Sequence, residues 1–549
     1  MVHHHLSLRL VLFILVPPLF AVAQDSSGCE VWYNPASLFE VSRENISCIP
    51  THNTKSSMVL QTNDEVWSKL LNEHPEYWEL PLTFPGGAHT TLILQEFKAY
   101  RSDVQIGHMT KDGLRTELYT PQLLSYRIAN DNIRGSLIFM EGQIAGAIRY
   151  KGVQYELGGL ECDGRKTGKF VLFATADALH KPAFECGLET LATHVIPPQP
   201  MGLPNLLQNE PITECVEVAL DIDFFTYNQF GGDCNATVEW ALALLTGVSE
   251  IYQTELNDLI YIAASYINIW ETPDPYAEFS GNAGDMLDAF RLEWLENPDL
   301  ANRPRDLVHL LTRRSDTGTG GIAYLSVNCD PAYAAGFSSF LSPSSVYSLN
   351  NYSWNLNVVA HEFGHNFGSN HTHWCGWPGG PIDDCYAAEG KCTNTPTPQI
   401  GTIMSYCHAV SGGSVNLEFH PTVENSALIP MINGQGTCYS TCDEFSTSCA
   451  YYGCTFEWAC NYDPEAVLND GSCTTEDLCG ECGGDGSSCY GCTDPVACNY
   501  DESNVVDDGS CFYSPNGGAC NCEAIMSLAD TLGPGETTSL AVSGFGYVA

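Results

Sequence analysis

The chain reads His361-Glu362-Phe363-Gly364-His365-Asn366-Phe367-Gly368-Ser369-Asn370-His371 at residues 361–371. The preceding run, Asn355-Leu356-Asn357-Val358-Val359-Ala360, has the apolar spacing of a helix that continues into this stretch. Side chains four positions apart share one face of a helix, so His361 and His365 can direct their imidazoles at one metal ion. Gly368 is expected to end the helix, because glycine tolerates the sharp turn that brings His371 round as a third ligand.

Three neutral imidazoles with an open coordination position form the ligand set of a catalytic zinc site, whereas a structural zinc site is closed. Glu362 adjoins the first histidine but points off the metal face. We therefore expect Glu362 to act as the general base that takes a proton from water and returns it to the leaving amine. His373 and His408 are competing ligand candidates, but neither has the helical spacing, and both are expected to be structural or surface histidines.

These residues resemble the metzincin clan of zinc endopeptidases, whose motif is H-E-x-x-H-x-x-G-x-x-H followed by a methionine turn. Here Gly401-Thr402-Ile403-Met404-Ser405-Tyr406-Cys407 would supply that turn. The resemblance implies that Met404 lies beneath the metal as an apolar floor and that Tyr406 faces the site, where it lines the site or stabilises the transition state. An isolated Met-Ser-Tyr carries little information, but its position downstream of His371 gives it weight.

Within the clan the chain is most similar to the reprolysin (adamalysin, ADAM-like) group. The likeness covers about 213–440 and rests on a pro-segment, a cysteine-rich tail and six cysteines that flank the motif, namely Cys329, Cys375, Cys385, Cys392, Cys407 and Cys438. One residue departs from the group, which usually has Asp after the third histidine, where this chain has Thr372. The resemblance implies an α/β domain with a mixed five-stranded sheet over the active-site helix, and an edge strand at Gly321 to Cys329 that pairs with substrate.

Composition indicates several domains and an extracellular protein. The 549 residues predict about three to four domains, and 49 Gly, 30 Pro and 25 Cys indicate a loop-rich, cross-linked chain. A formal charge of -44 would repel nucleic acid and anionic membranes. The acidic residues either form a solvated surface or, in part, bind cations.

The N-terminal region predicts export followed by a pro-domain. A weakly basic start, an apolar run from Leu10 to Phe20 and Ala21-Val22-Ala23 predict a signal peptide over 1–23, with no transmembrane anchor and secretion as the result. Residues 24–196 read as a β-rich pro-domain with strand-like runs such as 91–94 and 170–173. A proline-rich linker follows over 197–212.

The metallopeptidase domain is expected over 213–440. Alternation from Val216 to Phe224 predicts a strand, and further strands are expected near 260–262, 305–311 and 321–327. Helices are expected at about 237–256 and 285–295.

Latency would follow from one free cysteine, because a thiolate is a good fourth zinc ligand. Pro182-Ala183-Phe184-Glu185-Cys186-Gly187 resembles the cysteine-switch segment of reprolysin and matrix metalloproteinase zymogens, so Cys186 is the switch candidate and Cys162 the runner-up. A disulfide at Cys186 is the alternative. No dibasic site lies between Cys186 and Cys215, which leaves the activating cleavage undefined and autolysis possible.

Residues 441–522 carry an internal repeat: Gly453-Cys454-Thr455 through Cys473 is echoed by Gly491-Cys492-Thr493 through Cys511. Units this short need disulfides, and export makes disulfides more plausible than a zinc ribbon at Cys479 and Cys482. The repeats either bind calcium, with Asp463, Asp470, Asp501 and Asp508 as ligands, or use these aspartates to shape turns. They resemble Cys- and Asp-rich repeats of secreted bacterial proteins and, more loosely, thrombospondin-like modules. Residues 523–549 read as the start of a β-like C-terminal segment.

Two functions are compatible with these features. The first is a secreted zinc-dependent endopeptidase, made as a zymogen, whose partners are protein or peptide substrates and whose tail binds a matrix or cell surface. The alternative is an adhesion or matrix-binding protein whose protease-like domain is inactive or incidental. The complete ligand set with Glu362 favours the enzyme.

Overall fold

The structure is a computed structural model. It describes residues 23–24, 30–32, 37–42, 56–130, 132–140, 142–162, 165–178, 186–188, 214–341, 352–392, 400–411, 413–434, 438–441, 452–454, 458–463, 468–469, 473–477, 479–484, 486 and 488–514. Except for Ala23, the predicted leader lies outside these residues, as do the predicted linker at 197–212 and the segment 523–549. The chain divides into two compact units, Met1–Ala450 and Tyr451–Ala549.

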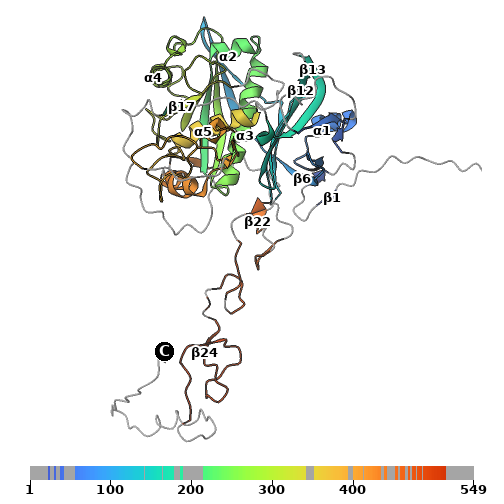
Figure 1. Ribbon diagram of the computed structural model, residues 1–549, viewed down its shortest axis with the longest axis vertical. Helices are drawn as coiled ribbons and strands as arrows, with labels where there is room; N and C mark the ends of the chain where they lie inside the picture. The colour runs from blue at the N-terminus through green and yellow to red at the C-terminus, as the bar shows by residue number, and fades with distance from the viewer. Residues whose placement is uncertain are drawn as a thin grey trace, which may run out of the picture. The chain divides into compact units, whose positions relative to one another are not determined.

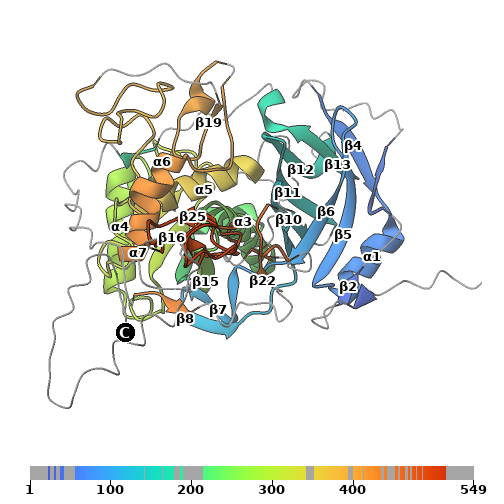
Figure 2. The same cartoon turned by 90° about the horizontal axis from the view of Figure 1, so that it is seen from below.

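The N-terminal region forms an 11-stranded sheet, in agreement with the expected β-rich character (Figures 1 and 2). The strands in spatial order are β1 (Ala23–Gln24), β2 (Glu30–Trp32), β5 (Tyr77–Thr83), β6 (His89–Glu96), β9 (Leu124–Ile128), β10 (Ile133–Met140), β11 (Gln143–Tyr150), β12 (Val153–Cys162), β13 (Arg165–Ala174), β4 (Met58–Thr62) and β3 (Phe39–Val41). The strand-like runs at 91–94 and 170–173 belong to β6 and β13. Helix α1 (Asp64–Glu73) begins after Asn63, whose side chain accepts two backbone N–H groups.

The two faces of this sheet pack against different partners. Along β10, Leu137 and Phe139 join the core beneath α1, whereas Ile138 joins a core that contains residues of two later helices. Successive side chains of a strand point to opposite faces, so both faces of β10 are buried. The N-terminal sheet is therefore packed against the domain that follows it in sequence.

The first unit also contains a second sheet, which has eight strands. Its strands in spatial order are β17 (Gly321–Ala323), β18 (Ala335–Ser338), β16 (Leu307–Leu311), β14 (Glu214–Ile222), β15 (Ile260–Trp270), β7 (Tyr100–Thr110) and β8 (Gly113–Leu118), with β21 (Ser440–Thr441) paired to β14. All eleven residues of β15 are buried, as expected for a parallel strand covered on both faces. The central strands thus form a rigid frame.

Helices cover both faces of the second sheet. The α-helices are α2 (Phe224–Gln229), α3 (Cys234–Glu255), α4 (Ala283–Glu296), α5 (Tyr352–Asn366), α6 (Pro421–Val423) and α7 (Ile429–Gly434). Short 3-10 helices lie at Thr175–Asp177, Ala277–Phe279 and Cys407–Ala409, a π-helical turn at Glu424–Leu428, and a small ladder joins β19 (Ile400–Gly401) to β20 (Ser414–Val415). Helices α3 and α5 share one core with residues of the N-terminal sheet, and α4 packs into the core on the other face.

Helices α3 and α5 approach each other closely at Gly247. A Cβ at this position would lie 2.6 Å from a methyl carbon of Leu356 and 2.7 Å from the hydroxyl of Tyr352. Only glycine leaves this space, so the sequence of α3 allows α5 to lie against it. The position of the active-site helix is fixed by this contact.

The expectation of a five-stranded sheet was incomplete. Residues 214–341 supply five strands, with β17 antiparallel to its neighbour and the others parallel, but β7 and β8 come from the predicted pro-domain and β21 from 440–441. Strand β7 pairs in parallel with β15, whose backbone would otherwise be an unpaired edge. The predicted boundary at 197–212 therefore does not separate the two sheets.

The predicted edge strand at Gly321 to Cys329 was too long. Strand β17 ends at Ala323, and Ser326 and Cys329 adopt positive φ values of 58° and 64°. The backbone N–H groups of Ser326 and Val327 donate to carbonyls of His365 and Asn366 at the end of α5, at 2.9 and 3.1 Å. The chain leaves the sheet here because it satisfies the last carbonyls of the helix.

Buried and half-buried carboxylates link the N-terminal region to the helices. Glu156 of β12 is 1% exposed, and its two oxygens accept the backbone N–H groups of Tyr352 and Ser353 at the start of α5, each at 3.2 Å. On α3, Glu239 accepts the backbone N–H of Leu123 at 2.8 Å and Glu250 that of Gly135 at 3.0 Å. These bonds connect the N-terminal region directly to helices α3 and α5.

The second unit is built from disulfide-linked repeats, as predicted. Cys454–Cys473 and Cys492–Cys511 are equivalent bridges, each with a sequence separation of 19. Each repeat also forms a short parallel ladder, β22 (Tyr452–Gly453) with β23 (Leu468–Asn469), and β24 (Tyr490–Gly491) with β25 (Val506–Asp507). Cys479 and Cys482 pair with Cys489 and Cys460, so they do not form a zinc ribbon.

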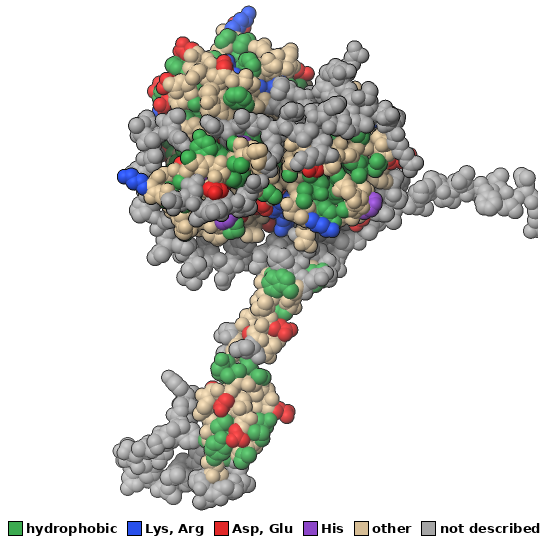
Figure 3. All heavy atoms as spheres, in the orientation of Figure 1, with side chains coloured by type: hydrophobic (Ala, Val, Ile, Leu, Met, Phe, Trp, Pro, Cys, Tyr) green, Lys and Arg blue, Asp and Glu red, His purple; other side chains and the backbone are tan. Residues whose placement is uncertain are grey.

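The distribution of surface charge, the apolarity of the helices and the disulfides are relevant to the cellular location of the chain. On the face drawn in Figure 3, acidic side chains are scattered among apolar and other polar groups. Within the described part of the chain, no helix combines the length and apolarity needed to cross a bilayer. Disulfides are typical of proteins that fold in an oxidising compartment.

Candidate metal centre and active site

Helix α5 presents His361 and His365 side by side, and both are completely buried. Their Nε2 atoms lie 3.2 Å apart, and the ring centroids are 4.8 Å apart. Gly368 has φ of +92°, a conformation that favours glycine, and the chain turns there. The ring of His371 then lies 4.8 Å from that of His365 and 5.2 Å from that of His361. The local sequence thus brings the three predicted ligands together.

Each of the three rings uses its Nδ1 atom in a hydrogen bond. The acceptors are the carbonyls of Ile403 for His361 and Ser369 for His365, each at 2.7 Å, and the Glu389 carboxylate for His371, at 2.6 Å. A neutral imidazole that donates through Nδ1 keeps a lone pair on Nε2. Burial lowers the pKa of His361 well below its usual value and that of His365 to about 3, which favours the neutral rings.

The donor set fits zinc. Zn–N bonds of about 2.0–2.1 Å in tetrahedral geometry place two ligand nitrogens about 3.3 Å apart, close to the 3.2 Å between His361 and His365. The three imidazoles and Cys186 offer ligand atoms that all lie within 4.8 Å of one another. Unprotonated nitrogens that converge in a buried space repel one another unless a cation lies between them.

Glu362 lies completely buried beside this cluster. Within the described part of the chain, its Oε1 atom has no hydrogen-bond partner, while Oε2 lies 3.6 Å from the sulfur of Cys186. A Cβ on Gly321, in the edge strand, would collide with this carboxylate, so glycine at 321 provides the space that Glu362 occupies. Burial raises the pKa of Glu362 well above its usual value.

Met404 packs against α5 at Gly364, between the two helical histidines. A Cβ on Gly364 would lie 2.5 Å from the Met404 sulfur, so the close approach requires glycine. The backbone N–H of Thr372 donates to the Met404 carbonyl at 3.0 Å and its hydroxyl donates to the same atom at 3.2 Å. The residue that departs from the reprolysin pattern therefore ties the third histidine segment to the methionine turn.

Tyr406 faces the cluster. Its hydroxyl lies 3.2 Å from Nε2 of His371 and accepts the backbone N–H of Cys186 at 2.8 Å. The tyrosine is 2% exposed, and its ring lies 4.8 Å from that of His371.

Cys186 reaches this site although it lies 175 positions before His361 in the sequence. Its sulfur lies 3.4 Å from Nε2 of His365, and the thiol is free, so the structure does not contain the alternative disulfide. The backbone N–H of Gly187 donates to the carbonyl of Gly321 at 2.8 Å, which places this segment parallel to the edge strand. Burial, with the Glu362 carboxylate, raises the pKa of the thiol well above its usual value.

The remaining histidines serve other contacts. His373 is buried, stacks on His371 at 5.0 Å and binds the Glu389 carboxylate at 3.1 Å, so it does not lie at the surface. His408 packs against Trp354 at 4.9 Å between ring centroids. Sequence reasoning missed Glu389, which bridges His371 and His373, and the close approach of Gly321 to Glu362, because neither belongs to a local motif.

The other predicted residues lie outside this cluster. Cys162 ends β12, and its side chain is outside the described part of the structure. Asp501 and Asp508 accept backbone N–H groups of Ser503 and Ser510, as turn-shaping aspartates do. Asp470 lies outside the described residues, and the backbone N–H of Asp463 donates to Cys454. Calcium binding by Asp463, Asp470, Asp501 and Asp508 stays a prediction.

The six cysteines around the motif form three disulfides. Cys329 pairs with Cys438, Cys375 with Cys392, and Cys385 with Cys407. The last two bridges hold the loop between His371 and the methionine turn, which also carries Glu389.

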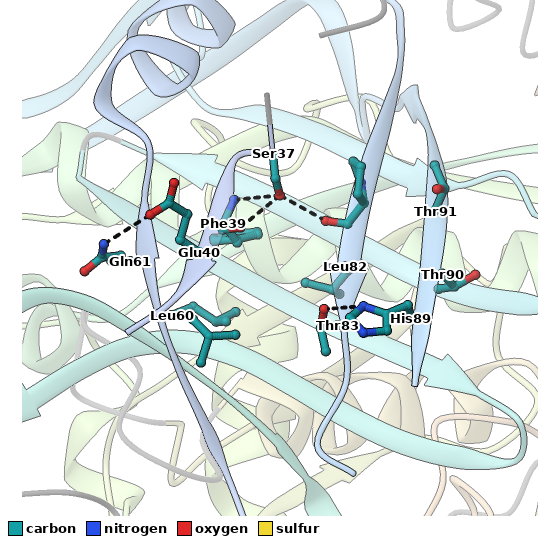
Figure 4. A pocket seen from close by; sticks show the side chains of 12 residues that line it. Ser37, Phe39, Glu40, Leu60, Gln61, Leu82, Thr83, His89, Thr90 and Thr91 are labelled. Atoms are coloured by element: carbon teal, nitrogen blue, oxygen red, sulfur yellow. Dashed lines mark hydrogen bonds between the residues drawn. The ribbon is translucent and has the colours of Figure 1, made fainter. Parts of the chain in front are cut away.

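A pocket in the N-terminal sheet offers different chemistry (Figure 4). Its polar side chains bond to one another or to nearby backbone: Ser37 donates to the carbonyl of Phe39 at 2.9 Å, and the Thr83 hydroxyl pairs with His89 at 2.7 Å. No metal-ligand group among the described residues includes a residue of this pocket. This pocket therefore offers no candidate metal site in the part of the chain that the structure describes.

A family model matches the part of the chain that carries this cluster. Residues 213–417 match the family model Reprolysin_5, described as "Metallo-peptidase family M12". The protein named "Disintegrin and metalloproteinase domain-containing protein 9" from Homo sapiens is 29% identical over 161 residues, which are 29% of this chain and 18% of that protein. Metalloproteinase-II from Bacteroides fragilis aligns in structure over 56% of this chain and 84% of its own, with 13% identity and a TM-score of 0.31. Residues 213–417 are therefore similar to the reprolysin-type metallopeptidases of family M12.

Proposed function

We propose that the chain is a secreted zinc-dependent endopeptidase made as a latent precursor. In this proposal His361, His365 and His371 hold the zinc ion, Glu362 is the general base, and Cys186 keeps the precursor silent. This assignment rests on the convergence of the three Nε2 atoms. The hydrogen bond that each ring makes through Nδ1 fixes the orientation of that ring.

Zinc bound by these residues would polarise the scissile carbonyl and acidify a water molecule. The unpaired Oε1 of Glu362 can accept the proton of that water and pass it to the leaving amine. Tyr406, whose hydroxyl already accepts one backbone N–H beside the cluster, can donate to the oxygen that gains charge during attack.

An extended peptide is the substrate class that the edge strand supports. The Gly321 carbonyl already accepts a backbone N–H from residue 187, which is how an added strand binds to a sheet edge. Because residues 186–188 occupy this edge and the sulfur of Cys186 lies against the imidazoles, a peptide cannot bind until they leave. This geometry supports latency through Cys186.

Zinc analysis combined with a cleavage assay tests the proposal. After the N-terminal region is removed, the protein should contain zinc and cleave a fluorescent casein. 1,10-Phenanthroline should stop cleavage, and added zinc should restore it. Glu362→Gln should retain the metal and lose about 10²- to 10⁴-fold in turnover. Glu296→Gln, at an exposed position on α4, is the matched control and should keep full activity.

Two outcomes would contradict the proposal. Protein without zinc would remove the metal site, and zinc-loaded protein that cleaves no peptide in a mixed library would favour the adhesion alternative. Secretion is tested separately, since the secreted chain should begin directly after Ala23 if the predicted leader is cleaved.

A further inference from the structure

A second cluster of metal-ligating side chains joins three segments that are distant in sequence. His108 comes from β7, Cys234 is the first residue of α3, and Glu271 directly follows β15. None of these residues belongs to the histidine cluster described above. His108 is 1% exposed, and the other two side chains are half-buried.

The distances within this cluster match a zinc ligand set in two of three cases. Tetrahedral zinc places a thiolate sulfur about 3.5 Å from a ligand nitrogen or oxygen. The Cys234 sulfur lies 3.6 Å from Nδ1 of His108 and 3.5 Å from Oε1 of Glu271. The third distance, 2.7 Å between Nδ1 and Oε1, is that of a hydrogen bond and would widen by about 0.6 Å around an ion.

The other side of the His108 ring is arranged as in a metal-bound histidine. Its Nε2 lies 3.2 Å from Oε1 of Glu117, on the neighbouring strand β8. A histidine that binds metal through one nitrogen commonly donates from the other nitrogen to a carboxylate, which fixes the tautomer and orients the ring. Glu117 therefore directs the Nδ1 lone pair toward Cys234 and Glu271.

Glu271 also provides access from solvent. It lines a surface cavity together with the β7–β8 turn at 110–115. A cation could reach the cluster by this route, and water or the Tyr227 hydroxyl, 3.9 Å from the Cys234 sulfur, could complete its coordination.

We propose that His108, Cys234 and Glu271 bind a second zinc ion, distinct from the proposed catalytic ion. The site ties β7, which belongs to the N-terminal region, to α3 and β15 of the metallopeptidase domain. Loss of the N-terminal region would remove His108 and so dismantle the site. The second ion would thus hold the precursor together and would leave the mature enzyme.

The competing explanation is that His108 bridges Glu117 and Glu271 by hydrogen bonds without a metal. That arrangement needs no thiol, whereas Cys234 contacts both the imidazole and the carboxylate. Cys234 is one of the free cysteines of the described residues, so its sulfur is available as a ligand.

Cobalt substitution tests the proposal in a full chain that carries His361→Ala, His365→Ala and Cys186→Ser. This background lacks the first site, so failure of the proposed function leaves the test unaffected. Titration with Co²⁺ should give about one equivalent bound and a near-ultraviolet thiolate-to-cobalt absorption band. Adding Cys234→Ser should abolish the band, whereas the matched control Cys215→Ser, at a free cysteine outside the cluster, should keep it.

Zinc analysis of the otherwise unchanged full chain provides a second test in case the triple variant misfolds. The full chain should hold two zinc equivalents, and Cys234→Ser or His108→Gln should hold one. Glu117→Gln should weaken the second equivalent about 10- to 100-fold. The proposal is overturned if the absorption band survives Cys234→Ser. It is also overturned if the full chain holds a single zinc ion that none of these variants removes. In either case His108 and Glu271 form only a hydrogen-bonded pair.

Discussion

The sulfur of Cys186 lies 3.4 Å from Nε2 of His365. The expected separation of a sulfur and a nitrogen bound to one tetrahedral zinc is about 3.5 Å. The backbone of the same cysteine donates to Tyr406, whose hydroxyl lies 3.2 Å from Nε2 of His371. Side chain and backbone of Cys186 therefore both engage the histidine cluster.

Cys186→Ser should activate the unprocessed chain. A serine hydroxyl is a much weaker zinc ligand than a thiolate, so the segment should lose its main hold on the site. We expect cleavage of a fluorescent casein by the intact precursor to rise at least about tenfold, which corresponds to about 1.4 kcal/mol. Cys215→Ser is the control, because Cys215 is buried and free but lies outside the cluster. Equal latency in both variants would exclude Cys186 as the switch.

Glu389→Gln should weaken zinc binding without unfolding the protein. Glu389 orients His371 through Nδ1 at 2.6 Å, and such carboxylate partners contribute about 10- to 100-fold to metal affinity. Competition with a zinc chelator measures the change. Glu278→Gln, at an exposed position, should retain the original affinity. An unchanged affinity in Glu389→Gln would show that the hydrogen bond does not orient the ligand.

Glu156→Gln should destabilise the contact between the N-terminal sheet and α5. The two oxygens of Glu156 accept two backbone N–H groups at the helix start, and an amide has only one oxygen to replace them. The expected loss is about 1–2 kcal/mol in the free energy of unfolding, from the lost cap and the helix dipole. Urea unfolding of the full chain measures it, with Glu79→Gln on β5 as control. Matching midpoints for the two variants would refute the capping role.

Asp221 should make stability depend on pH. Burial raises the pKa of this carboxyl from 3.8 to about 7, although Tyr276, Trp294 and Asn268 donate hydrogen bonds that lower it. Between these values the unfolded chain releases the proton and the folded chain keeps it, so the free energy of unfolding falls as pH rises from about 4 to 7. Asp221→Asn should reduce this fall by roughly 2–4 kcal/mol.

Urea unfolding at several pH values measures the Asp221 effect. Asp299→Asn, at an exposed position, should follow the original chain at every pH. If Asp221→Asn and Asp299→Asn lose the same stability between pH 4 and pH 7, the carboxyl at 221 is not protonated in the folded protein.

The sequence predicted the parts of the site that are local. His361, His365, Gly368 and His371 lie within eleven residues, so helical periodicity and one glycine turn are enough to bring the imidazoles together. The methionine turn and the repeats of the tail could be recognised for the same reason, since their residues stand at fixed short spacings.

The sequence did not predict the parts that depend on long-range packing. Strand β7 reads as part of a separate pro-domain, yet it pairs with β15, more than 150 residues later. Glu389 reaches His371 because two disulfides fold its loop back, and disulfide pairing cannot be deduced from spacing. His108, Cys234 and Glu271 are likewise brought together only by the tertiary fold.

X-ray absorption at the zinc edge tests the central claim most directly. The measurement should use the full-length precursor carrying Cys234→Ser, so that only the histidine cluster can contribute a sulfur ligand. The spectrum should show three nitrogen ligands at about 2.0–2.1 Å and one sulfur at about 2.3 Å. Precursor that binds no zinc, or zinc surrounded only by nitrogen and oxygen, would contradict this account of the site and its latency.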